Sequence, residues 1–399
     1  MIGSIAPSVA LRGIGSIVGV GETDYGEDYA AWRAGGPDYV GPSVEEFAER
    51  SFSRALEDCG LERDDVDGLI STLDYGAVGV ETIAKALSVQ PRFSDSAGSM
   101  AGIVANAVTA LAGGRADTVA VLYASRSRGS GRQFGGDTYV GADRSSYYYY
   151  HPWGWSAQAA HWALMFRYYQ ETYGATEADL GSVAVELRQH ALRNPNAIMQ
   201  KPLSIDEYLA SRYIVRPLHL FDLCIPNDGS VCLILRRTDE ANDLRHIPVA
   251  VAGWADVEVT ESKMHHMVKE RLRTQLQAAG RGALEMAGVS LADVQHFEGY
   301  DASTIHLINQ IEGYGFVEPG QGLAFCQDGQ MDVGGRLPTN ISGGLLSEAY
   351  MHGWNHLAEA ARQLRHEAGD RQILDVTTTL FSLTTTESSH PLVLRRADA

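Results

Sequence analysis

A glycine-rich turn near the carboxyl end of the chain carries side chains suited to acid–base chemistry. The segment NISGGLLSEAYMHGWN, residues 340–355, reads as a turn at Gly343 and Gly344 that opens directly into a helix. The first amides of a helix are unpaired and the helix dipole is positive there, so the turn can hold a developing negative charge. Tyr350 follows at a place where histidine would be the easier proton carrier at neutral pH.

A phenol suits a reaction in which the proton to be moved belongs to an alcohol. Its unperturbed pKa of about 10 matches such a weak acid better than that of a carboxylate does. A neutral phenol can also donate a hydrogen bond to an oxyanion. A wholly apolar pocket would oppose phenolate formation, so a nearby donor or positive dipole is required. His352, two residues after Tyr350, is a candidate for that role.

The best candidate for contacting an anionic substrate is the segment SRSRGSGRQFGG, residues 125–136. It places Arg126, Arg128 and Arg132 among glycines. A solvated loop is the simpler interpretation of the same residues.

The composition indicates a globular cytoplasmic protein. The 399 residues are 45% hydrophobic, enough for one large core or two fused cores. The chain has neither an apolar run of about 18 residues nor the pattern of a signal peptide, so we expect no membrane span. A net charge of −18 disfavours nucleic-acid binding. The cysteines lack C-x-x-C spacing, which argues against a structural zinc site and for a reducing cytoplasm. They are Cys59, Cys224, Cys232 and Cys326.

An internal repeat organises the chain. The segment ALEDCGLERDDVDGLI, from Ala55, returns as ALEMAGVSLADVQHFE, from Ala283, at an offset of 228 residues (283 minus 55). Each copy reads as a helix that ends near Gly60 or Gly288, followed by a buried strand. A repeat of this length indicates a duplicated domain, so we expect halves at residues 1–240 and 241–399.

The order of elements continues in parallel after each repeated segment. A helix, a small-residue turn, a long helix and an apolar strand follow in both halves. The expected elements are 66–72, 77–89, 92–114 and 118–125 in the first half, and 294–300, 303–316, 336–364 and 372–382 in the second. Such halves favour sheets that sandwich the two long helices, whose starts near residues 98–102 and 343–344 would then face one site.

An insertion at residues 126–220 interrupts the first half. Eleven of the 28 residues in its segment 147–174 are Tyr, Trp or Phe. That is too apolar for a solvated loop. We expect the aromatic segment, above all residues 147–169, to cover a site, bind an apolar ligand or form an interface.

Together these features resemble the thiolase fold over nearly the entire chain, and more narrowly the sterol-carrier (lipid-transfer) type of thiolase-like protein. The narrower resemblance rests on four segments in order: YLASRYIVRPLHLFDLCIPNDGS, EGYGFVEPGQG, GGRLPTNISGGLLSEAYMHGWN and EAARQLRHEAGDRQI. It implies an α/β thiolase fold, with two βαβαβ halves in a layered αβαβα arrangement and an aromatic-rich insertion in the first half.

Thiolases of this family carry a nucleophilic cysteine and two histidines, and this chain departs at all three places. In SAGSMAG, Ser99 or Gly98 stands where the cysteine would fall. Tyr300, in EGYDAS, corresponds to the strand-end histidine, and Tyr350 to the histidine of the Gly-His-Pro motif. The C-terminal Cys-x-Gly element is absent, and Cys326 lies elsewhere. We therefore expect no thiolate to form an acyl-enzyme.

The paired replacement by tyrosine resembles the thiolase-like aldolases of bacterial steroid side-chain degradation. That resemblance implies retro-aldol cleavage of a β-hydroxyacyl-CoA thioester to a ketone or aldehyde and a short acyl-CoA. Tyr300 and Tyr350 would be the acid–base pair, and amides at Ser99, Gly343 and Gly344 would form or support the oxyanion site.

The same resemblance implies further properties. No cofactor or metal is expected besides the coenzyme A of the substrate. A homodimer is expected, with a small zinc-ribbon/OB-fold protein or a hydratase subunit as a further partner. Asp301 would either orient a phenol or cap the following helix. The aromatic insertion fits either a bulky acyl group, such as a steroid, or the docking face for the partner.

Two other functions remain open on the sequence. One is an acyltransferase or β-ketothiolase that uses Ser99, Cys326 or a thiol of a partner. The other is a non-catalytic subunit of a hetero-oligomer, since the missing cysteine and histidines fit that interpretation too. The aldolase is preferred because both histidine positions carry the same proton-capable residue.

Overall fold

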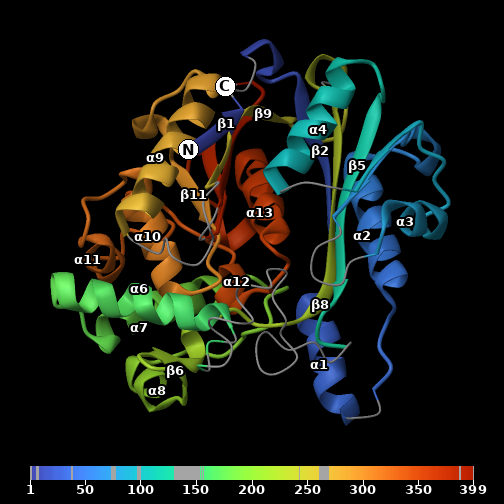
Figure 1. Ribbon diagram of the computed structural model, residues 1–399. Coiled ribbons are helices and arrows are strands. Elements are labelled where there is room, and N and C mark those ends of the chain that lie inside the picture. Colours follow the sequence, from blue (N-terminus) through green and yellow to red (C-terminus); the bar gives the residue numbers. More distant parts are fainter. Residues whose placement is uncertain are drawn as a thin grey trace.

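The chain folds around a mixed α/β core that contains two copies of one strand arrangement (Figure 1). The computed structural model describes residues 2–5, 9–36, 39–72, 78–96, 100–129, 153, 155, 157–241, 243–259, 269–385 and 388–398. Within these residues the strands of both halves belong to a single hydrogen-bonded sheet, apart from two strands of the insertion that pair with each other. No helix in this part of the chain has both the length and the apolar character needed to cross a bilayer.

The strand order of the first half is repeated in the second. The first runs β4 (Phe93–Asp95), β3 (Gly68–Ser71), β5 (Thr118–Arg126), β8 (Asp228–Arg237) and β2 (Gly15–Glu22). The second runs β11 (His296–Gly299), β12 (Thr378–Thr384), β13 (Ser388–Arg396) and β9 (Val249–Trp254). A parallel bridge between Phe297 and Thr339 stands where β4 pairs with β3. The halves join where β2 and β9 pair antiparallel, so the predicted duplication is confirmed.

Two short strands extend the second half beyond β13. They are β10 (Asp256–Val259), which pairs with β13, and β1 (Ile2–Ile5), which pairs with β10. Both pairings are antiparallel. The amino-terminal strand thereby lies on the sheet of the carboxyl-terminal half.

The helices form outer and central layers, as expected. α2 (Val44–Cys59) and α3 (Val80–Ala86) lie outside the first half, and α9 (Lys269–Ala287) and α10 (Thr304–Tyr314) outside the second (Figure 1). α4 (Met100–Ala112) and α13 (Trp354–Arg365) lie between the halves, because each contacts strands of both. Gly60 and Gly288 both have the positive φ of a helix-ending glycine, 74° and 70°. A further helix, α1 (Tyr25–Gly35), follows β2.

The second central helix does not begin at Gly343 and Gly344, and that prediction was wrong. A single turn, α12 (Gly344–Ser347), comes first, and α13 begins only at Trp354. Tyr350 therefore lies in the link between two helices. Its amide donates to the side chain of Asn227 rather than to an intrahelical carbonyl. The left-handed backbone of His352, with φ 53°, then interrupts the helical path.

The insertion forms a separate layer that packs on the second half. It contains α6 (Gln158–Tyr173), α7 (Glu177–Leu192), α8 (Ile205–Ala210), β6 (Tyr213–Val215) and β7 (Leu218–His219). Three aromatic side chains of α6 are buried: Trp162, Phe166 and Tyr169. The Tyr169 hydroxyl donates to Glu312 of α10 over 2.6 Å. Leu164 and Tyr168 are 49% and 45% exposed, so α6 also presents an apolar outer face. Residues 147–152 lie outside the described residues.

Candidate active site

Tyr300 and Tyr350 meet inside the protein, as the sequence predicted. Their hydroxyl oxygens are 2.9 Å apart, within hydrogen-bond distance. Tyr300 follows the end of β11, and Tyr350 lies between α12 and α13. Both side chains are buried, with 6% and 3% of their surface exposed. Two phenols 50 residues apart in the sequence thus form one polar pair in a largely apolar core.

The backbone of each tyrosine is held by named partners. The Tyr300 amide donates to the Ser382 carbonyl of β12 over 3.0 Å. The Tyr300 carbonyl accepts from the side chain of Gln310 over 2.8 Å. The side chain of Asn227, just before β8, holds the Tyr350 amide. Because β12 and β8 belong to different halves, the distance between the hydroxyls depends on how the halves pack.

Asn340 fixes the strand end that carries Tyr300. Its side-chain oxygen accepts from the Gly299 amide and its side-chain nitrogen donates to the Gly299 carbonyl, each over 2.8 Å. Its own φ is 49°, a left-handed value that asparagine tolerates better than most residues. One amide side chain therefore occupies both backbone groups next to a proposed catalytic residue.

His352 packs against both tyrosines. Its ring centroid lies 5.9 Å from that of Tyr300, at 90°, and 6.2 Å from that of Tyr350. Tyr123 of β5 is a third aromatic neighbour at 6.1 Å. His352 is only 8% exposed, so it does not face solvent. Its positive φ shows that it is not part of a helix. The polar ring thus lies next to both tyrosines, and its support of a phenolate stays a prediction.

A buried chain of ionisable side chains includes Glu298 and Asp301, which flank Tyr300 in the sequence. His356 of α13 contacts Asp301 through Nε2 at 3.0 Å and Glu298 through Nδ1. Glu298 also faces His296 at 2.9 Å, and all four side chains are fully buried. Burial alone would lower the pKa of His356, but hydrogen bonds to Asp301 and Glu298 raise the pKa to about 10. His356 is therefore an imidazolium between two carboxylates at neutral pH.

Asp301 caps a helix, but not the one that follows it in the sequence. Its carboxylate accepts from the amides of Leu345 and Leu346 in α12, over 2.9 and 3.3 Å. The following helix, α10, is capped instead by the side chain of Ser303. Asp301 is therefore a helix cap, as one of the two alternatives predicted, but it caps α12 rather than α10. A folded chain can bring a carboxylate to amides that are remote in sequence.

The amides of the glycine turn already have acceptors on the protein. The Gly343 amide donates to the Asn340 carbonyl over 3.0 Å, and the Gly344 amide points to the Ser342 hydroxyl at 3.5 Å. The next two amides bind Asp301. Gly343 and Gly344 therefore support the site through its shape, because their donors are engaged elsewhere.

The start of α4 reaches the same place from the first half. A Cβ built on Gly353 would lie 3.3 Å from Met100 Cε and 3.6 Å from Tyr300 Cδ2. Met100 is the first residue of α4, so the amino end of that helix lies beside the tyrosine. Ser99, predicted to support an oxyanion there, lies outside the described residues.

Of the three arginines proposed to contact an anionic substrate, Arg128 is held by contacts within the protein. The Arg128 guanidinium lies over the ring of Trp32, 4.3 Å from its centroid, and donates to the Pro226 carbonyl over 2.6 Å. Arg126 is the last residue of β5, and Arg132 lies outside the described residues. Contact between these arginines and an anionic substrate, such as the coenzyme A part of a thioester, stays a prediction.

The four cysteines are unsuited to act as nucleophiles. All are unpaired, and three of them are buried. Burial raises the pKa of every thiol above its usual value, to about 12 for Cys326. The described cysteines therefore remain thiols at neutral pH, which disfavours acyl transfer through Cys326.

Sequence reasoning missed several polar residues that position the pair. Asn227, Asn340 and His356 all lie within or next to the segments that carry the family resemblance. Asparagine in IPND and TNIS reads as a turn residue, and His356 reads as one face of an amphipathic helix. Their partners are remote in sequence, so only the structure reveals what they hold.

The duplicated α/β fold, its two central helices and the polar pair just before the second of them are the features of a thiolase-type protein. The family model "Thiolase C-terminal domain-like" matches residues 257–394. The chain is 33% identical to the steroid side-chain-cleaving aldolase of Thermomonospora curvata, over 96% of this chain and 98% of that protein. It is 35% identical to the 17-hydroxy-3-oxo-4-pregnene-20-carboxyl-CoA lyase of Mycobacterium tuberculosis, over 89% and 92%.

The solved structure of the Ltp2-ChsH2(DUF35) aldolase agrees with these relatives. It superposes with a TM-score of 0.85 at 31% identity, over 98% of this chain and 100% of that one. The chain therefore belongs to the thiolase superfamily, among its sterol-carrier-like members. Within that superfamily it is a thiolase-like aldolase, a carbon–carbon lyase.

Proposed function

We propose that the protein cleaves the Cα–Cβ bond of a β-hydroxyacyl-CoA thioester, with Tyr300 and Tyr350 as the proton carriers. The observation that carries this proposal is the 2.9 Å contact between the two phenol oxygens. Retro-aldol cleavage needs a base for the β-hydroxyl and a donor for the enolate, but no covalent intermediate. A pair of phenol hydroxyls in a chain whose described thiols stay protonated fits those needs.

The reaction divides between the two phenols. One tyrosine, as phenolate, takes the proton of the β-hydroxyl while its partner donates a hydrogen bond to the phenolate, which stabilises the charged form. The Cα–Cβ electron pair moves to the thioester, the β-carbon leaves as a ketone or aldehyde, and the enolate oxygen accepts hydrogen bonds. Protonation of the α-carbon by the second phenol then yields the short acyl-CoA, and transfer of the abstracted proton from the first tyrosine to the second across the 2.9 Å contact restores the starting state.

The rest of the site supplies orientation and charge. Asn340 and Gln310 fix the backbone on both sides of Tyr300. His352 is the polar ring that contacts both phenols. Backbone amides at the start of α4 are the donors that we propose for the enolate oxygen, because those of α12 are engaged by Asp301.

The proposed substrate carries a bulky acyl group with a steroid-like skeleton. The relatives named for steroid side-chain cleavage and for a pregnene carboxyl-CoA support that choice. A small DUF35 protein of the zinc-ribbon/OB-fold type is the proposed partner, supported by the name of the similar aldolase structure. We further propose a homodimer in the cytoplasm. The exposed aromatic face of α6, with Leu164 and Tyr168, is available for one of these contacts.

The test compares Tyr300→Phe and Tyr350→Phe with the control Tyr314→Phe. Tyr314 is also buried and hydrogen-bonded, to Ser382 and Ser389, but the structure shows no contact between its hydroxyl and the pair. Each variant, co-expressed with the small partner, is assayed on a β-hydroxyacyl-CoA panel for release of a carbonyl product. Turnover should fall about 10²- to 10⁴-fold in the first two variants. Retained turnover in both would contradict the proposal.

A further inference from the structure

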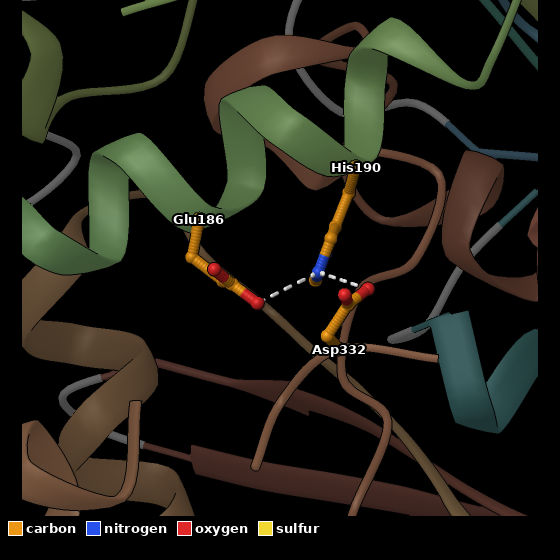
Figure 2. Close-up of side chains that lie close together, drawn as sticks. All are labelled: Glu186, His190 and Asp332. Carbon is orange, nitrogen blue, oxygen red and sulfur yellow. Dashed lines mark ion pairs between the residues drawn. The ribbon is translucent and has the colours of Figure 1, made fainter. Parts of the chain in front are cut away.

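Away from the tyrosine pair, three potential metal ligands converge between the insertion and the second half. Glu186 and His190 lie four residues apart on one face of α7, and Asp332 lies in the segment that follows α11 (Gly322–Gln327) (Figure 2). His190 Nε2 is 3.3 Å from Glu186 Oε1 and 3.6 Å from Asp332 Oδ1. Figure 2 shows both carboxylates pointing toward the imidazole.

The second nitrogen of the imidazole determines what Nε2 can do. His190 Nδ1 lies 3.2 Å from the Asn340 carbonyl oxygen, which can only accept a hydrogen bond, so Nδ1 carries the proton. In the neutral ring Nε2 therefore presents its lone pair to two carboxylates. The side chain is fully buried, and Nε2 has no hydrogen-bond partner among the described residues. A lone pair aimed at two anions requires a cation between them.

The spacing of the ligand atoms favours a metal ion over a proton. A proton on Nε2 would be expected to draw one carboxylate to an ordinary hydrogen-bond length of about 2.7–3.2 Å. A tetrahedron with metal–ligand bonds of about 2.05 Å has edges of about 3.3 Å, which is close to both contacts from Nε2. We propose that Glu186, His190 and Asp332 bind one Zn²⁺ ion, with water completing the tetrahedron.

One neighbouring cation competes with the proposed ion. The Arg193 guanidinium contacts Asp332 Oδ1 at 2.5 Å, so it neutralises part of the charge that the zinc would use. Glu186 and Asp332 are 20% and 47% exposed at the side chain, which leaves a path for the ion from solvent. Zinc binding would therefore displace or loosen Arg193 and would depend on both carboxylates.

The proposed ion would stabilise the contact between the insertion and the second half, and this contact is connected to Tyr300 through Asn340. It would link α7 of the insertion to the Asp332 segment, and it would fix the His190 tautomer that holds the Asn340 carbonyl. Asn340 in turn holds the Gly299 backbone next to Tyr300. The inference is independent of the reaction proposed above, because it concerns binding and stability alone.

The experiment measures Zn²⁺ binding to the untagged, chelator-treated full chain by equilibrium dialysis and by thermal unfolding. We expect one zinc per chain and a higher unfolding temperature with zinc. Glu186→Gln and Asp332→Asn alter partly exposed residues and should preserve the fold. Each should weaken zinc binding by more than about tenfold, the lower end of the loss seen for even an outer-shell partner. His190→Gln should abolish the thermal shift.

The matched control is Glu367→Gln. His246 also faces two carboxylates, but Glu367 contacts its Nδ1 and Asp58 its Nε2, so the ligand atoms do not converge on one nitrogen. This variant should bind zinc like the parent, whereas Arg193→Gln should bind it more tightly. The absence of a stoichiometric zinc would overturn the proposal. So would equal affinity in the parent, Glu186→Gln and Asp332→Asn, which would indicate adventitious binding only.

Discussion

The buried His356, held between Glu298 and Asp301, makes stability depend on pH in a defined direction. His356 has a pKa of about 10 in the folded protein and an ordinary value of 6.5 when unfolded. Below pH 6.5 both states bind the proton, and the interaction contributes fully. Between pH 6.5 and 10 only the folded state keeps it, so the contribution falls by about 1.4 kcal/mol per pH unit. The whole contribution is on the order of 5 kcal/mol.

His356→Gln isolates this contribution. The variant leaves two buried carboxylates, Glu298 and Asp301, without their shared cation, which should cost about 3–5 kcal/mol near pH 6.5. The stability gap between parent and variant should then shrink by about 4 kcal/mol as the pH rises to about 9.5. Urea unfolding of both proteins at several pH values measures the gap directly.

His161→Gln is the control for this experiment. Burial lowers the pKa of His161 to about 4, so this ring is neutral in both states above pH 6.5. Its stability gap should change by less than about 0.5 kcal/mol between pH 6.5 and 9.5. A gap for His356→Gln that is equally constant would refute the assignment of an imidazolium at His356.

Three further outcomes follow from the described contacts. Gly344→Ala should lower the free energy of unfolding more than Gly369→Ala does, and it should also reduce turnover. The two glycines have nearly equal φ values, 59° and 60°, but only at Gly344 would an added Cβ clash, because it would lie 2.2 Å from Asp301 Oδ2. Urea unfolding and turnover assays compare the two variants. Tyr169→Phe should lower the unfolding free energy by about 1–3 kcal/mol, since Glu312 loses a buried donor, while kcat changes little. Iodoacetamide at pH 7.5 should leave turnover intact, because burial keeps the thiols protonated; inactivation in step with alkylation of one thiol would contradict this.

The fold was largely predictable because the sequence repeats the same order of elements in its two halves. The 228-residue offset, the glycines that end α2 and α9, and the apolar strands all follow from local patterns. The break between α12 and α13 could not be predicted. SEAYMHG contains no proline, and the interruption depends on Asn227, a residue from the other half.

The meeting of the two phenols was predictable, but the residues that hold them in place were less so. Tyr300 and Tyr350 could be named because they occupy positions where a family motif expects histidine. The roles of Asp301 and Gly344 depend on each other across more than 40 residues, and no local pattern encodes that contact. The proposed zinc site could not be predicted for the same reason, since Asp332 is remote in sequence from α7.

The Asn340 side chain makes hydrogen bonds to the Gly299 backbone that a neighbouring strand would otherwise make. In the first half β4 flanks β3, whereas in the second half the flanking chain pairs only at Thr339 before Asn340 satisfies the Gly299 backbone. Because a side chain replaces the remainder of that edge strand, the main chain can leave the sheet one residue later. It then crosses toward Tyr350 rather than along the border of the sheet, so the two halves of the duplicated scaffold differ at the place where the proposed catalytic tyrosines meet.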